Sequence, residues 1–217
     1  MRAARNHRLA GLYLVADLSM PDDKLVSAVK AALKGGVQVV QIWNPDMAPS
    51  KNLLETCKEI IFATKTAKIP LIVNNNLELA KLLGADGIHF DDFSKSAKDA
   101  RIILGEHAIV GYTCGNDQSL ITRAAEFGAD YISFCAVFPS PSVQSCEIVP
   151  LESVRRAKEL VTIPVFASGG ITLQNAHLVM EAGADGLAIA SSILRADDPE
   201  RQADAFRTII NRYLTAE

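Results

Sequence analysis

Glycine and hydroxyl residues follow the last two apolar runs of the sequence in a pattern that can bind an anion. The segment "ASGGITLQN" leaves one run through Gly169 and Gly170, and "AIASSILRADDPE" leaves the next through Ser191 and Ser192. Glycine lets the backbone come close to a ligand, and the first turn of a helix offers unpaired N–H groups to an anion. The alternative is a tight turn at the glycines and a helix cap at the serines. We favour phosphate binding because both features follow consecutive runs.

Other polar side chains follow the earlier apolar runs. The groups are Asp17; Gln41 and Trp43; Asn74, Asn75 and Asn76; His89, Asp91 and Asp92; Thr113 and Cys114; and residues 138–142. Whether they form one site depends on the elements that carry them.

Four similar stretches indicate a repeated helix–strand unit. They are "ALKGGVQVVQI", "KLLGADGIHF", "AAEFGADYISF" and "VMEAGADGLAI". Each ends a helical pattern on glycine, which readily adopts the left-handed conformation that closes a helix. The apolar runs that follow are typical of strands buried on both faces of a parallel sheet.

Eight strand-like runs follow one another along the chain: "GLYLVAD", "VQVVQIW", "PLIVNNN", "GIHF", "AIVGYT", "YISFCAVF", "PVFASGG" and "GLAIASSI". Helical patterns lie between most of them, for example at 22–34, 51–67, 118–127 and 173–182. This alternation predicts an α/β protein, a single-domain (β/α)8 TIM barrel over residues 11–217 after a short N-terminal extension of residues 1–10. A doubly wound sheet is the alternative, but no G-x-G-x-x-G follows the first strand. In a barrel, all the polar groups above meet at the C-terminal ends of the strands.

The bulk composition excludes several classes of function. The chain is 49% hydrophobic and 22% charged, with a net charge of −3 and no basic stripe, so nucleic acid is not an expected partner. Its apolar runs are too short to cross a bilayer, and no apolar segment of a secretory signal follows "MRAARNHR". The cysteines show no CxxC spacing and indicate neither a zinc site nor a disulfide framework. We expect a cytoplasmic protein without a membrane partner.

The order of the motifs resembles the thiamine-phosphate synthase family, which includes thiazole tautomerases. The resemblance covers about residues 11–195, through "LYLVAD", "GGVQVVQI", "IVNN", "LGADGIHF", "GADYISF", "FASGGIT" and "AGADGLAI". It implies an enzyme of thiamine biosynthesis that uses Mg²⁺ to join a hydroxymethylpyrimidine pyrophosphate to a thiazole phosphate, releasing pyrophosphate. It also allows for a homodimer. The matching positions imply catalytic roles for the following residues: Gln41, Asn74, Thr113, Ser140 and Ser142.

Several positions depart from the family pattern. In place of the family's arginine, its two lysines and its two metal-binding aspartates, this chain has Trp43, Pro45, Val143, Asn75 and Ser94. The histidine of the tautomerase branch is Gly115. Removing one electrostatic group of this kind typically costs about 3 kcal/mol in the barrier. Losing two therefore predicts a rate roughly ten-thousandfold lower.

Substitutes for the missing groups are conceivable nearby. Asp91 and Asp92 could hold Mg²⁺ with the help of substrate phosphates, or could simply begin a solvated loop. Lys95 and Arg195 could reach a phosphate, or could remain on the surface.

Trp43 shares strand parity with Val39 and Gln41, so these side chains are expected to point into the barrel mouth. Trp43 then either packs there or offers a face on which a heterocycle stacks. We expect it to bind substrate together with Asn75, His89, Asp91 and Asp92. Cys114 and His89 could form a nucleophile pair across neighbouring strand ends, or Cys114 could be a buried apolar residue.

Three functions follow from these residues. The first is a divergent thiamine-phosphate synthase that binds a phosphorylated thiazole-type heterocycle. The second is an isomerase or hydrolase acting on a small heterocyclic phosphate. The third is a phosphate-ligand binding barrel without chemistry. The lineage favours the first, and the missing charges favour the other two.

Overall fold

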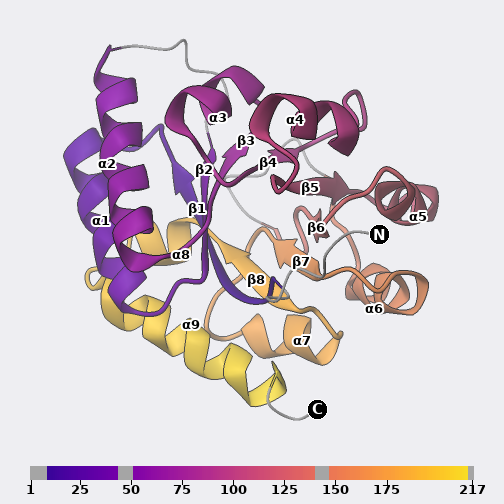
Figure 1. Cartoon of the computed structure of the whole chain (residues 1–217). Helices are drawn as coiled ribbons and strands as arrows, with labels where there is room; N and C mark the ends of the chain where they lie inside the picture. The colour runs from indigo at the N-terminus through magenta and orange to yellow at the C-terminus, as the bar shows by residue number, and fades with distance from the viewer. Residues whose placement is uncertain (1–8, 44–50, 140–146, 215–217) are drawn as a thin grey trace.

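Eight parallel strands close into a barrel in the order in which they occur in the sequence, so that β8 pairs with β1. The computed structural model describes residues 9–43, 51–139 and 147–214. Helices surround the strands, following one another around the outside of the ring (Figure 1). The predicted single-domain (β/α)8 barrel is confirmed.

The strands are β1 Gly11–Asp17, β2 Val39–Trp43, β3 Leu71–Asn74, β4 Gly87–Phe90, β5 Ile109–Cys114, β6 Tyr131–Phe134, β7 Val165–Ser168 and β8 Gly186–Ile189. The helices are α1 Asp22–Lys34, α2 Lys51–Ala67, α3 Leu77–Leu83, α4 Ala97–Leu104, α5 Gln118–Glu126, α6 Leu151–Leu160, α7 Ala176–Glu181, α8 Ser191–Leu194 and α9 Pro199–Leu214. Within these described ranges, no helix combines the length and apolar character needed to span a membrane.

One predicted helix starts later than expected. The pattern over 173–182 and the glycine turn before it predicted a helix beginning near Thr172, but α7 begins at Ala176. The Asn175 side chain explains the delay, because its Oδ1 accepts the Thr172 N–H at 2.7 Å and its Nδ2 donates to the Gly170 carbonyl at 3.0 Å. These bonds hold residues 170–175 in a turn that competes with the helix.

The repeated "GAD" motif has a structural role at the N-terminal side of the barrel. The aspartate of each motif lies directly before one strand. Its side chain accepts the backbone N–H of the first or second residue of the preceding strand in the barrel. Asp86 accepts from Leu71 at 2.9 Å, and Asp185 accepts from Val165 at 2.8 Å. Asp130 accepts from Val110 at 2.8 Å in the same way. The motif therefore provides a hydrogen-bond acceptor for backbone N–H groups at the starts of neighbouring strands.

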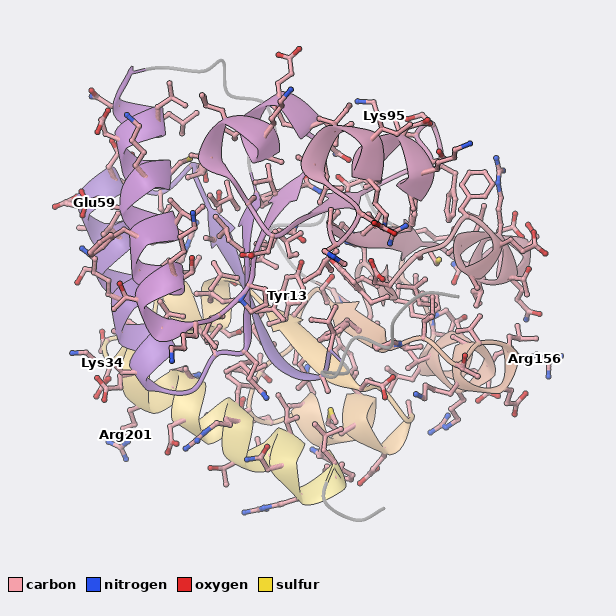
Figure 2. All side chains as sticks on the ribbon, viewed as in Figure 1. Tyr13, Lys34, Glu59, Lys95, Arg156 and Arg201 are labelled. Atoms are coloured by element: carbon pink, nitrogen blue, oxygen red, sulfur yellow. The ribbon has the colours of Figure 1, made fainter. Side chains whose placement is uncertain are left out.

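The barrel interior is filled by an aromatic layer, separate from the larger apolar core between strands and helices. Tyr13, Tyr131 and Phe166 pack at ring-centroid distances of 5.4 to 6.0 Å. Figure 2 shows Tyr13 amid the ring of strands, whereas the labelled charged side chains lie at the periphery. Gly111 provides the space, since a Cβ there would lie 2.1 Å from Cζ of Tyr131. This layer forms the floor beneath the C-terminal mouth.

Candidate active site

A cavity of about 370 Å³ opens at the C-terminal ends of the strands. It brings together most of the residues predicted from the sequence. Those that line it are Gln41, Trp43, His89, Asp91, Thr113, Gly169, Gly170, Ser191 and Ser192. The prediction that Val39, Gln41 and Trp43 point into the barrel is confirmed. Gln41 and Trp43 line the cavity, and Val39 packs in the interior layer below them.

Three further predicted residues that the structure describes do not line this cavity: Asn74, Asn75 and Asp92. Asn74 and Asn75 lie behind Asp91 and contact its carboxylate. Asp92 is directed into its own loop, where Oδ1 accepts the Ser94 N–H at 2.8 Å. The Ser94 hydroxyl and that backbone bond together lower the pKa of Asp92. Ser140 and Ser142 lie outside the described residues, as do Pro45 and Val143.

Several lining residues were not predicted from the sequence. They are Tyr13, Tyr131, Ser133, Cys135 and Phe166. The signal for them was strand parity: on β6, for example, Tyr131 and Ser133 occupy alternate positions of one strand and therefore face the same side.

A chain of hydrogen bonds crosses the cavity floor from β2 to β5. Tyr13 OH donates to Gln41 Oε1 at 2.6 Å and lies 2.9 Å from Tyr131 OH. Tyr131 OH lies 2.9 Å from Nδ1 of His89, and Nε2 of His89 lies 2.8 Å from Thr113 Oγ1. Each hydroxyl has one proton to donate. Because Tyr13 donates to Gln41, Tyr131 donates to Tyr13, His89 donates through Nδ1, and Thr113 donates to Nε2.

Burial fixes the protonation of this chain. Desolvation lowers the pKa of His89 to about 4, although the nearby Asp91 carboxylate opposes this effect. Desolvation also raises the pKa of Tyr13 and Tyr131 well above the usual value. At neutral pH the chain therefore consists of a neutral imidazole and protonated hydroxyls, and it positions Gln41 and Thr113 without adding charge.

Two asparagines hold Asp91 in place: Asn74, the last residue of β3, and Asn75, which follows it. Asn74 Nδ2 donates to Oδ1 at 3.0 Å, and Asn75 Nδ2 donates to Oδ2 at 2.8 Å. The backbone N–H of Asp91 donates in return to Asn75 Oδ1 at 3.0 Å. Asn75 has a left-handed backbone, with φ of 54°, which asparagine adopts more readily than most residues.

The rim formed after β7 and β8 contains the predicted phosphate-binding residues. Gly169 and Gly170 have φ values of 88° and 66°. A Cβ at Gly169 would lie 2.5 Å from Cα of Ala136, so the turn needs glycine for its own packing. Ser191 begins α8, and the Ser192 hydroxyl donates to the Ile171 carbonyl at 2.7 Å. The tight-turn interpretation thus has a geometric basis, while phosphate binding stays a prediction.

Of the two alternatives for Cys114, the structure supports the buried apolar residue and not a nucleophile pair with His89. Cys114 is the strand neighbour of Thr113 and points to the opposite face, where its Sγ donates to the Leu120 carbonyl at 3.6 Å. Desolvation raises the pKa of Cys114 to about 12, so its thiol stays protonated. The ring nitrogens of His89 are engaged by Tyr131 and Thr113 instead. Cys114 is a buried apolar residue.

The described residues do not fit the Mg²⁺ site that the family resemblance implies. Among the described lining residues, Asp91 is the sole carboxylate, and both of its oxygens accept asparagine amide hydrogens. Asp92 is turned away, and the part of the chain that the structure describes contains no group of three or more metal-binding side chains. Lys95 lies at the outer surface (Figure 2), and Arg195 is also exposed. Neither residue lines the cavity.

Comparison with known proteins gives a consistent result along the whole barrel. The family model described as thiamine monophosphate synthase matches residues 12–193. The thiamine-phosphate synthase of Aromatoleum aromaticum is 37% identical over 94% of this chain and 98% of that protein. The corresponding protein of Methanobrevibacter smithii is 36% identical over 87% and 90%.

A solved structure supports the same relationship. The thiamine phosphate pyrophosphorylase from Pyrococcus furiosus superposes with a TM-score of 0.81 at 27% identity, covering 94% of this chain and 97% of that one. The match in sequence and in structure runs through the strands that build the cavity. The chain is therefore a member of the thiamine monophosphate synthase family.

Proposed function

We propose that this protein binds a phosphorylated thiazole-type heterocycle at the C-terminal mouth of the barrel, as a thiamine-phosphate synthase-type protein of thiamine biosynthesis. The observation that carries the proposal is the composition of the cavity. One side is the glycine and serine rim after β7 and β8, and the rest is mainly aromatic and neutral. Such a pocket suits a flat ring that carries one phosphate.

The proposed binding mode uses the residues around this cavity. The phosphate lies against Gly169, Gly170, Ser191 and Ser192, where N–H groups and a hydroxyl are available to an anion. The ring lies toward Trp43, on which it can stack. Gln41 uses its Oε1 for Tyr13, which leaves its amide hydrogens for a ring nitrogen of the ligand.

We also propose that coupling to hydroxymethylpyrimidine pyrophosphate is slow. The described lining residues include no lysine or arginine, and their single carboxylate is engaged by amides. The leaving pyrophosphate therefore meets little opposing charge in the described part of the site. The rate is expected to be roughly ten-thousandfold or more below that of a site with the full charge set.

Two measurements on the purified protein test this proposal. Calorimetry with thiazole phosphate should show binding, and Ser191→Asp should abolish it because a carboxylate would occupy the rim. Ser27→Asp makes the same change on the exposed face of α1 and should bind normally. Pyrophosphate release with both precursors and Mg²⁺ should be detectable but slow. No binding by the unchanged protein, or equal loss in both variants, would contradict the proposal.

An isomerase or hydrolase is the second candidate, and His89 favours it. Nε2 of this neutral imidazole accepts the Thr113 hydroxyl proton and lies 4.0 Å from the Asp91 carboxylate, so a proton can pass between the ring and a ligand through Thr113. Proton and phosphorus NMR of thiazole phosphate incubated with the protein alone distinguishes this function. Conversion of the ligand without the pyrimidine precursor would support it.

A homodimer stays a prediction.

A further inference from the structure

The buried polar groups beneath the cavity form a chain of hydrogen bonds that runs in one direction. The chain leads from Gln41 through Tyr13 and Tyr131 to His89, and it ends at Thr113. We propose that Tyr13 and Tyr131 are positioning residues that keep the His89 proton on Nδ1 and thereby turn the oxygen lone pairs of Thr113 toward the cavity. This inference goes beyond the proposed function, because it concerns the protein without ligand and does not depend on which ligand the cavity takes.

The direction of the chain is set at the end far from the imidazole. Tyr13 OH lies 2.6 Å from Oε1 of Gln41, a separation typical of an O–H group that donates to oxygen and short for an amide N–H donor. Tyr13 therefore uses its single proton for Gln41 and accepts from Tyr131, whose OH lies 2.9 Å away. Tyr131 has then used its own proton. Its oxygen faces Nδ1 of His89, at 2.9 Å, as an acceptor.

An acceptor at Tyr131 requires a proton on Nδ1 of His89. With that proton on Nε2 instead, the lone pairs of Nδ1 and of the Tyr131 oxygen would face each other between two buried side chains. Two buried acceptors without a proton between them lose a hydrogen bond that would compensate for their desolvation. Burial also keeps the ring neutral at pH 7, because it lowers the pKa of His89 to about 4, so the ring has a single N–H proton to place.

Packing holds the two tyrosine hydroxyls in this chain. The Phe166 ring packs edge-on against Tyr13 and Tyr131, at centroid distances of 5.4 and 5.5 Å. The Tyr131 ring also stacks on the His89 imidazole at 5.5 Å, with 26° between the ring planes. Tyr13 is 3% exposed and Tyr131 is 1% exposed, so neighbouring side chains supply the partners of both hydroxyls. The rings are fixed, and the direction of each hydroxyl hydrogen follows from the acceptor that it meets.

The tautomer of His89 decides what Thr113 offers to the cavity. An unprotonated Nε2 accepts the Thr113 proton at 2.8 Å, which leaves the Oγ1 lone pairs for a ligand. A protonated Nε2 would donate to Thr113, whose proton would then be free for a ligand or for the Asp91 carboxylate at 3.5 Å. Asp91 favours this second arrangement, since its Oδ1 lies 4.0 Å from Nε2. The two tyrosines oppose it, and Asn74 and Asn75 weaken it by donating to the Asp91 oxygens.

Nitrogen NMR of the ligand-free protein at pH 7 tests the inference, because the ¹⁵N shift of a ring nitrogen reports whether that nitrogen carries a proton. The unchanged protein should show a protonated Nδ1 and an unprotonated Nε2 for His89, and the loss of these signals in His89→Gln assigns them. Tyr13→Phe leaves both hydrogen-bond partners of the imidazole in place but frees the Tyr131 proton for Nδ1. Most molecules of this variant should therefore carry the His89 proton on Nε2.

A second variant acts one bond further from the imidazole. Gln41→Leu removes the acceptor of the Tyr13 proton, which then turns to Tyr131, so the same change of tautomer is expected. The control is Tyr112→Phe, which removes a buried tyrosine hydroxyl outside the chain, one that donates to the Lys95 carbonyl at 2.7 Å. It should leave the tautomer of His89 unchanged. Circular dichroism checks that each variant folds.

Three results would each overturn the inference. The first is a proton on Nε2 of His89 in the unchanged protein. The second is an unchanged tautomer in folded Tyr13→Phe or in folded Gln41→Leu. The third is a change in Tyr112→Phe as large as that in Tyr13→Phe. None of these results bears on whether thiazole phosphate binds, which the calorimetry of the proposed function decides separately.

Discussion

The buried imidazole of His89 predicts a specific loss of stability in mild acid. His89 is 4% exposed, and its ring nitrogens are bonded to Tyr131 and Thr113. Desolvation lowers its folded-state pKa from 6.5 to about 4. The unfolded chain therefore binds a proton below pH 6.5 that the folded protein does not bind until the pH is near 4. Unfolding takes up a proton in this window, so stability falls as the pH falls.

The size of the effect follows from the two pKa values. A shift from 6.5 to about 4 makes the His89 contribution to the unfolding free energy fall by about 2 kcal/mol between pH 7 and pH 5. The groups that face this ring are Asp91, whose charge opposes the shift, and the hydroxyls of Tyr131 and Thr113.

Urea denaturation at pH 7 and pH 5 measures this difference. The test compares the decrease in the free energy of unfolding from pH 7 to pH 5, so the stability of His89→Gln at pH 7 itself does not matter. This decrease should be about 2 kcal/mol smaller in His89→Gln than in the unchanged protein. His107 is exposed, and His107→Gln should follow the unchanged protein at both pH values. The reasoning is refuted if His89→Gln and the unchanged protein lose the same stability between pH 7 and pH 5.

Three further predictions concern the scaffold and are measured by chemical denaturation. Gly111→Ala should cost about 1–3 kcal/mol because its methyl group would overlap the Tyr131 ring, and a neutral result would mean that the ring can move aside. Lys68→Gly should stabilise the folded protein by about 0.5–1 kcal/mol, because residue 68 has a left-handed backbone with φ of 58° that glycine adopts more easily than lysine. Lys65→Gly, within α2, should destabilise it. Stabilisation by both variants would exclude the backbone explanation. Asp185→Asn should cost about 1–2 kcal/mol by weakening the bonds at the start of β7, and unchanged stability would contradict the role assigned to the "GAD" motif.

The sequence predicted the barrel because its repeat is local. A glycine that ends a helix and an apolar run that follows it can be read without knowledge of the partners, and a parallel sheet is the arrangement that buries such runs on both faces. The same regularity located the ends of the strands. Gln41, Trp43, His89 and Thr113 could therefore be placed near the cavity from their positions alone.

Features that depend on contacts between distant residues could not be predicted in this way. The bond between Asn75 and Asp91 joins the loops after β3 and β4, and the Tyr13–Tyr131 contact spans the barrel. Asp91 and Asp92 are neighbouring aspartates that the sequence alone does not distinguish. Asp91 faces the cavity, whereas Asp92 accepts the Ser94 N–H within its own loop. The two alternatives for Cys114 could have been decided by strand parity, because Cys114 directly follows Thr113 and therefore points to the opposite face of β5.

The proposed function depends on the rim after β7 and β8 binding the phosphate of a heterocyclic ligand. A crystal structure with thiazole phosphate bound tests it most directly. We expect phosphate density against Gly169, Gly170, Ser191 and Ser192, with the ring inside the cavity beside Trp43. Phosphate density at another part of the molecule, with the rim filled by its own side chains, would contradict it.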